Sequence, residues 1–153
     1  MNFKTFFHYI SYIQYPLMLI ATYFVLSPYI NEIEQLKKNP DLLFKNLNLT
    51  LIFMGLGISF SSLQDTSKTQ NKFSKKIWEN PKKGKIMIAF MSFMILCSLI
   101  FGLIGYFSTE IGILKELSIG IIVLGLGMFG LLKASIEMFE NHRKDKNTGY
   151  NTV

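Results

Sequence analysis

The chain has 153 residues, of which half are hydrophobic and 14 are phenylalanine, and its formal net charge is +6. One soluble core of this length could hardly bury so much apolar surface, and the mean hydropathy is positive. The composition therefore excludes an ordinary soluble domain and predicts an integral membrane protein.

Four long stretches lack charged residues, namely 5–31, 46–64, 86–109 and 117–132. About 20 mainly apolar residues span a bilayer, and the short fourth stretch can be lengthened by 111–114 and by a snorkelling Lys133. We predict an all-α, four-helix transmembrane bundle built from two hairpins. It forms a single domain over 1–143, with helices at about 8–30, 41–64, 85–108 and 113–140, and a polar tail over 144–153.

The basic residues are distributed unevenly among the predicted loops. Four of the 16 fall on one side, at Lys37, Lys38, Lys45 and Lys115, and the other twelve fall on the side shared by both termini and the middle loop. Basic residues in short loops mark the cytoplasmic side. The topology predicted is N-in and C-in, in a bacterial inner membrane, with the positive charge facing anionic lipid headgroups.

The first predicted helix contains Pro16, which should kink it, and is read as a retained helix, not as a cleaved signal. Five aromatic residues crowd its cytoplasmic half: Phe6, Phe7, Tyr9, Tyr12 and Tyr15. They are typical of an interfacial aromatic belt, and the alternative is a site for an aromatic ligand.

The middle loop is predicted to hold a short amphipathic cytoplasmic helix. Ser67 and Gln70 have the spacing of a capping box, and Asn80-Pro81 is a stop signal. Lysines occupy one sector of the helical wheel and apolar residues the rest, as expected of a helix lying on a membrane surface. The residues expected to contact lipid or a partner are Lys72, Phe73, Lys75, Lys76 and Trp78; a solvated basic loop is the alternative.

Small residues form stripes on three predicted helices, where they would let helix backbones approach closely. The predicted helix-packing residues are Gly55, Gly57, Ser59, Gly102, Gly120, Gly127 and Gly130. The sequence leaves open whether these contacts lie within one chain or between chains.

A Gly-Leu-Gly motif occurs twice, at 55–57 and at 125–127. Both copies fall on a helix predicted to run inward as the second arm of a hairpin. The two hairpins are therefore candidate parallel repeats, although one such match is as readily explained by chance.

Chemistry-bearing motifs are missing from the sequence. No ionisable residue falls between the predicted membrane interfaces, and no nucleophile triad, phosphate-binding loop or zinc motif is present. His8 and His142 lack partners at metal-ligand spacing, apart from Glu137 and Glu140 near His142 on a helix expected to be solvated. We expect no catalytic residues, no cofactor, no metal and no nucleic-acid partner.

The run from Gly57 to Ile86, "GISFSSLQDTSKTQNKFSKKIWENPKKGKI", resembles a segment of small uncharacterised four-helix membrane proteins of Flavobacterium-like bacteria. The resemblance implies a location in a bacterial inner membrane. It brings no activity and no functional residue to this chain.

These features favour a non-enzymatic inner-membrane protein that acts by helix packing. It would be an accessory or scaffolding subunit of a membrane complex, or a homo-oligomer. The alternative is an oligomeric pore or channel, or a membrane-disrupting effector, with Ser59, Ser61, Ser62 and Gln64 at its cytoplasmic mouth.

Overall fold

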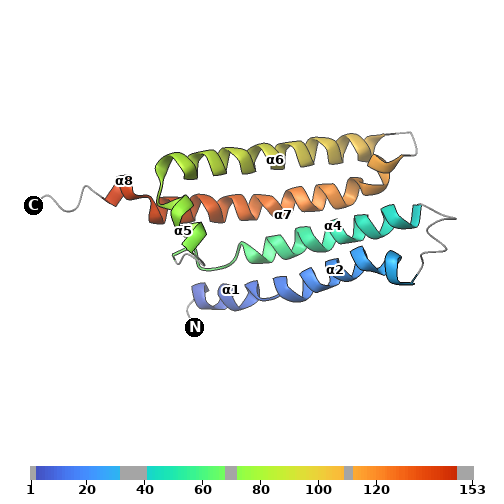
Figure 1. The fold of residues 1–153 in the computed structure, drawn as a ribbon, viewed down its shortest axis with the longest axis horizontal. Helices are drawn as coiled ribbons and strands as arrows, with labels where there is room; N and C mark the ends of the chain where they lie inside the picture. The colour runs from blue at the N-terminus through green and yellow to red at the C-terminus, as the bar shows by residue number, and fades with distance from the viewer. Residues whose placement is uncertain (1–2, 32–40, 68–71, 109–111, 148–153) are drawn as a thin grey trace, which may run out of the picture.

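The computed structural model describes residues 3–31, 41–67, 72–108 and 112–147. The regular elements of these residues are all helices, shown in Figure 1. The long ones are α2 (Gln14–Asn31), α4 (Asp41–Ser61), α6 (Pro81–Phe107) and α7 (Ile113–His142). The short ones are α1 (Phe3–Ser11), α5 (Lys72–Trp78) and α8 (Lys144–Asn147).

Four helical segments are long and apolar enough to cross a membrane: Phe3–Ile30, Asp41–Ser61, Pro81–Phe107 and Ile113–His142. The first of them is α1 and α2 together, interrupted by a turn at Tyr12 and Ile13. Pro16 explains the interruption, because it has no N–H to donate to the carbonyl of Tyr12 and its ring crowds that carbonyl. The kink expected from Pro16 is therefore present.

The start of α6 is fixed by Asn80 and Pro81. The side-chain oxygen of Asn80 accepts hydrogen bonds from the backbone N–H groups of Lys82, at 3.0 Å, and Lys83, at 3.2 Å. Pro81 occupies the first helical position, where no N–H is needed. The pair predicted to stop the loop helix thus also begins α6, four residues before the predicted start at 85.

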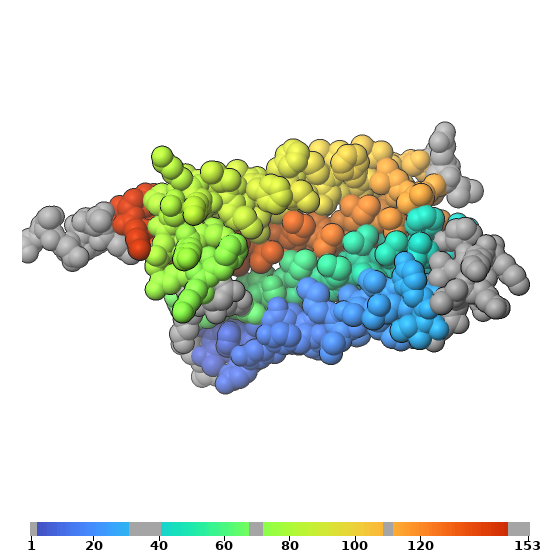
Figure 2. All heavy atoms as spheres, viewed as in Figure 1, coloured from blue at the N-terminus to red at the C-terminus, as the bar shows by residue number. Residues whose placement is uncertain are grey.

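The four long helices lie side by side in a row, in the order α2, α4, α7, α6 (Figures 1 and 2). α4 packs against α2 and α7, and α7 packs against α4 and α6, whereas each outer helix has one extensive long-helix neighbour among the described residues. The expected bundle is thus corrected to an open row without a shared central core. Lipid is as apolar as the helix surfaces, so no hydrophobic gain drives such a row to close.

One end of the row carries most of the basic residues and is called here the lysine-rich end. There α1 begins, α4 ends, α5 lies across the row, and α7 continues into α8 (Figure 1). The even number of spans that the charge pattern predicts agrees with this arrangement.

Two predicted segments differ in detail or lie outside the described residues. The tail predicted over 144–153 begins with the short helix α8. The capping box of the middle loop includes Gln70, which is not among the described residues, and the described helix α5 covers two turns from Lys72.

Candidate functional site

The seam between α4 and α7 is the closest helix contact built from glycine. A Cβ atom added at Gly127 would collide with the backbone carbonyl of Gly55, and one added at Gly55 would lie 2.6 Å from the carbonyl oxygen of Val123. At the two ends of the seam, a Cβ at Gly120 would lie 2.7 Å from the carbonyl oxygen of Asn48, and one at Gly130 would lie 2.7 Å from Ser62 Oγ. These glycines therefore join helices of one chain.

Two polar side chains reinforce the row. The side-chain oxygen of Asn48 on α4 accepts a hydrogen bond from the backbone N–H of Gly120 on α7 at 2.7 Å. The Thr50 hydroxyl is buried, lying 2.9 Å from the Asn46 carbonyl oxygen of its own helix and 3.5 Å from that of Ala21 on α2. Hydrogen bonds between helices commonly contribute to helix association in a membrane.

The two Gly-Leu-Gly motifs do not occupy equivalent positions. In the first, Gly55 faces α7 and Gly57 faces Met18 on α2; in the second, Gly125 faces Leu99 on α6 and Gly127 faces α4. Gly55 and Gly125 are aligned by sequence, but Gly55 packs against the other hairpin and Gly125 against its own. The reverse holds for the aligned pair Gly57 and Gly127. The sequence match gives no support to a repeat in that register.

Two further packing predictions lie on other contacts. A Cβ at Gly102 of α6 would lie 2.6 Å from Ile122 Cγ1 of α7, so Gly102 packs the outer pair of helices. The backbone carbonyl of Ser59 accepts a hydrogen bond from Ser62 Oγ at 2.7 Å, and the predicted role of the Ser59 side chain in helix packing stays a prediction.

The residues predicted to form a basic surface on α5 divide into two groups. Lys72, Phe73, Lys75 and Lys76 are exposed, and Phe73 is 73% accessible. Trp78 is only 7% accessible, and its indole N–H donates to Ser74 Oγ at 2.9 Å. The expectation of an outward-facing Trp78 is therefore wrong, because its ring packs into the protein and anchors α5.

An ion pair joins the residue that follows α5 to the first residue of α8. Lys144 Nζ lies 2.8 Å from a carboxylate oxygen of Glu79, and the backbone N–H of Lys144 donates to the Glu79 carbonyl at 3.2 Å. The hydrogen bond from Lys144 lowers the pKa of the Glu79 carboxyl below its ordinary value. Nearby, the Arg143 guanidinium lies over the Phe139 ring and lowers the pKa of Asp145 by a hydrogen bond.

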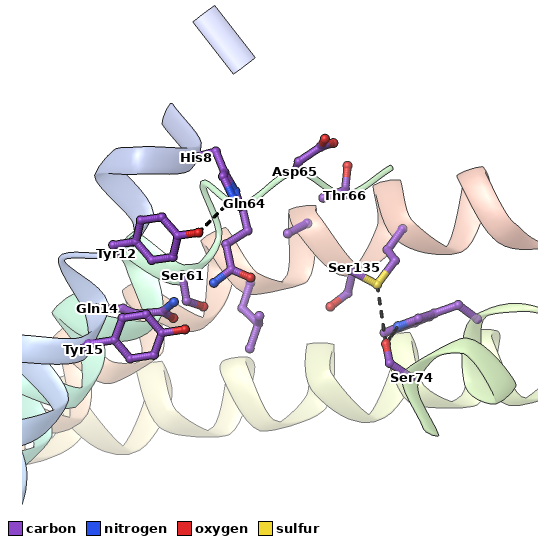
Figure 3. Close-up of a pocket in the computed structure, with 14 residues that line it drawn as sticks. His8, Tyr12, Gln14, Tyr15, Ser61, Gln64, Asp65, Thr66, Ser74 and Ser135 are labelled. Atoms are coloured by element: carbon purple, nitrogen blue, oxygen red, sulfur yellow. Dashed lines mark hydrogen bonds between the residues drawn. The ribbon is translucent and has the colours of Figure 1, made fainter. Parts of the chain in front are cut away.

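A hollow of about 740 Å³ lies beneath α5, at the lysine-rich end (Figure 3). Four parts of the chain line it: α1 and the start of α2, the end of α4 with the residues after it, α5, and α7. The lining residues are His8, Tyr12, Gln14, Tyr15, Ser61, Gln64, Asp65, Thr66, Ser74, Trp78, Leu131, Ala134, Ser135 and Met138.

The hollow lies beside the end of α4. That helix ends at Ser61, four residues after Gly57, which lies against Met18 of α2. α2 therefore packs extensively along α4, whereas α1, which precedes the turn at Tyr12 and Ile13, touches it only slightly. The gap is walled by Tyr12 and Tyr15, whose rings stack at 6.0 Å with an interplanar angle of 19°. The Tyr12 hydroxyl lies 3.3 Å from His8 Nε2.

Two ionisable groups besides the tyrosines line the hollow, His8 and Asp65. His8 Nδ1 is buried and makes no hydrogen bond to another described residue. Among the described residues, no three His, Cys, Asp or Glu side chains are grouped so as to hold a metal ion. The remaining polar lining consists of neutral hydroxyl and amide groups, which can form hydrogen bonds to a bound molecule.

The sequence alone does not reveal the hollow, because its walls come from four separated segments. One signal pointed to it: the aromatic side chains of the first helix, for which a ligand site was the alternative interpretation. The structure brings Tyr12 and Tyr15 of that set to the hollow, together with Ser61 and Gln64.

Comparison of the chain with protein families, with curated proteins and with solved structures gives no match. The inference of function therefore depends on the geometry described above.

Proposed function

We propose that this chain is a non-enzymatic protein of a bacterial inner membrane, with both termini in the cytoplasm. It acts by helix packing, as an accessory or scaffolding subunit of a membrane complex or as a homo-oligomer. The four apolar helices and the concentration of lysines at one end support the location and orientation.

The observation that carries the proposal is the outer face of α2. This helix lies at an edge of the row, with α4 as its one extensive neighbour among the described long helices. Its outer face is formed by five exposed residues at helical spacing: Tyr15, Leu19, Tyr23, Leu26 and Ile30.

Tyr23 distinguishes this face from a surface made only for lipid. Its side chain is 59% exposed, and its hydroxyl makes no hydrogen bond to another residue of the described part of the chain. It lies roughly 12 to 14 Å along the axis from either end of α2, at 1.5 Å per residue. An unpaired hydroxyl is unfavourable in hydrocarbon, and a neighbouring protein helix can supply its acceptor.

The outer face of α6 provides the contrast. Away from its ends, its large exposed residues carry no hydroxyl, among them Phe90, Phe93 and Phe101, and the exposed Ser92 hydroxyl donates to the Ile88 carbonyl of its own helix at 2.9 Å. Its exposed tyrosine, Tyr106, lies one residue from the end of the helix. Lipid alone can cover such a face, because the face leaves no hydroxyl without a hydrogen-bond acceptor away from the helix ends. We therefore assign the protein contact to α2.

Photo-crosslinking in native membranes tests this assignment. A photoreactive phenylalanine analogue replaces Tyr23 in one variant and Phe101, which is 55% exposed, in the matched control. The proposal predicts a discrete heavier product from position 23 and none of comparable yield from position 101. Equal yields, or no product from position 23, would count against it.

A pore built from several copies is the second candidate, because Ser61 and Gln64 line the hollow at the lysine-rich end. Conductance in planar bilayers that changes in Gln64→Leu would favour this function. Silent bilayers containing the wild-type protein would eliminate it.

A further inference from the structure

The hollow lies at the level where the membrane boundary crosses the lysine-rich end. Its α7 wall includes Ala134 and Ser135, which directly follow the exposed Lys133. A lysine at this position marks the depth at which a helix leaves hydrocarbon. On the other wall, Tyr15 lines the hollow although it is 57% exposed, so the space is open past α1 toward the surroundings.

The charged residues of the lining indicate which class of ligand the hollow can bind. None of the described residues that line the hollow is Lys or Arg, the side chains that bind phosphate and carboxylate groups. The one lining carboxylate, Asp65, projects away from the other labelled side chains in Figure 3. An anionic headgroup would thus find no lysine or arginine among these lining residues, and a neutral ligand is favoured.

The polar groups that remain are neutral hydrogen-bonding groups. Gln14, Ser61 and Gln64 lie with the two tyrosines on one side of the hollow, and Ser135 lies on the other (Figure 3). Hydroxyl and amide N–H groups donate to carbonyl or hydroxyl oxygens of a ligand. The ligand should therefore carry such oxygens.

The shape and volume of the hollow set a further requirement for the ligand. The rings of Tyr12 and Tyr15 stack with each other at one side of the hollow and direct their hydroxyls toward the other lining residues (Figure 3), and Trp78 and Met138 contribute apolar surface elsewhere. Aromatic rings pack well in offset-stacked or edge-to-face arrangements. A volume of about 740 Å³ lies within the range of small-molecule sites.

We propose that the hollow binds a neutral, lipid-soluble ring compound bearing carbonyl oxygens, of the quinone class. The ligand enters sideways from the bilayer past α1. Its ring lies against Tyr12 and Tyr15, and its oxygens accept hydrogen bonds from the amides and hydroxyls of the lining. The proposal concerns binding alone, and Tyr15 is the one residue that it shares with the outer face of α2.

Trp78 is a natural fluorescent probe of ligand binding, because it is the one tryptophan of the chain and lines the hollow. Quinones quench indole fluorescence when they are held close to it. The full chain, in nanodiscs of zwitterionic lipid, is titrated with decylubiquinone while Trp78 emission is followed. A membrane-spanning peptide with a single tryptophan measures quenching by quinone dissolved in the bilayer.

We expect saturable quenching in the protein and linear quenching in the peptide. Gln64→Leu should weaken binding about tenfold, which corresponds to the loss of one hydrogen bond to a ligand oxygen of about 1.4 kcal/mol. Tyr15→Phe should weaken it by a smaller factor, whereas Tyr23→Phe, the same change on the same helix outside the hollow, should leave it unchanged. Ser61→Phe should fill the space and abolish saturation.

Three results would overturn the proposal. Linear quenching equal to that of the peptide would show that the hollow holds no quinone. Saturable quenching with the same affinity in Tyr15→Phe, Tyr23→Phe and Gln64→Leu would place the site elsewhere. Competition by oleate that is as strong as competition by a second neutral quinone would show that the ligand class is wrong. The two tyrosine variants are conservative, so they test the site even where Ser61→Phe fails to fold.

Discussion

The α4–α7 seam and the lysine-rich end are built from the same helices, and yet they pack in opposite ways. Along the seam, the backbone of Gly127 meets that of Gly55 with no side chain between them. At the lysine-rich end, α1, which precedes the break at Pro16, touches α4 only slightly, and larger polar and aromatic side chains surround a hollow.

The difference shows how a membrane protein controls local packing without a hydrophobic driving force between helices. Glycine permits backbone contact, in which dispersion and hydrogen bonding hold the helices together. Where α4 ends and the first helix is interrupted, tyrosine and glutamine side chains line the space between the segments with hydrogen-bonding groups. The seam is thus suited to stability and the hollow to binding.

The largest effect is expected from a single methyl group at the seam. Gly127→Ala places a Cβ against the Gly55 backbone, which cannot move aside, and should destabilise the protein by about 2–3 kcal/mol. Gly57→Ala is the matched control, because its Cβ would lie 3.2 Å from Cε of the flexible Met18. Thermal unfolding in detergent compares them, and equal losses of stability would contradict the assignment of the seam.

The next effect concerns the hydrogen bond across the seam. Asn48→Leu removes the acceptor of the Gly120 N–H and should cost about 1 kcal/mol, as measured for such bonds in membranes. Asn46→Leu removes an amide that donates to Leu42 of its own helix, so the loss should be smaller. Unfolding in mixed micelles ranks the two variants, and the reverse order would refute the role given to Asn48.

The third effect concerns the break between α1 and α2 at the lysine-rich end. Pro16→Ala restores an N–H opposite the Tyr12 carbonyl, so α1 and α2 should become continuous. Hydrogen exchange at the amides of residues 12–15 should slow about tenfold, the effect of roughly 1.4 kcal/mol of added local stability. Pro28→Ala, near the other end of α2, should leave exchange at these amides unchanged; an unaltered rate in Pro16→Ala would show that the break has another cause.

The smallest effect is the response of α5 to pH. Lys144 lowers the pKa of Glu79 in the folded protein below its ordinary value of 4.5. The stabilising pair is therefore fully present above pH 4.5 and is lost as the pH falls through the lower, folded value. Trp78 emission should be constant from pH 7 to 5 and change only below this range. Glu79→Gln should lack that step, and a step of equal size in this variant would assign it to another group.

The sequence was sufficient to predict the four apolar helices, because length and hydropathy determine what can span a bilayer. Asn80 shows where local signals are ambiguous: the same Asn-Pro pair stops one helix and caps the next. The open row could not be predicted, since small-residue stripes indicate which faces pack but not whether the outer helices meet. Trp78 was misplaced because helical periodicity does not reveal that α7 lies beneath α5. The hollow was missed because four distant segments form it.

The mass of the native particle tests the central claim, assembly through α2, most directly. The protein is extracted from its own membrane in nanodiscs without detergent exchange and weighed by native mass spectrometry, alongside a Tyr23→Leu variant. The account predicts a particle heavier than the 17.6 kDa chain by a second copy or another subunit, and loss of that partner in the variant. A wild-type particle containing one chain and lipid alone would contradict it.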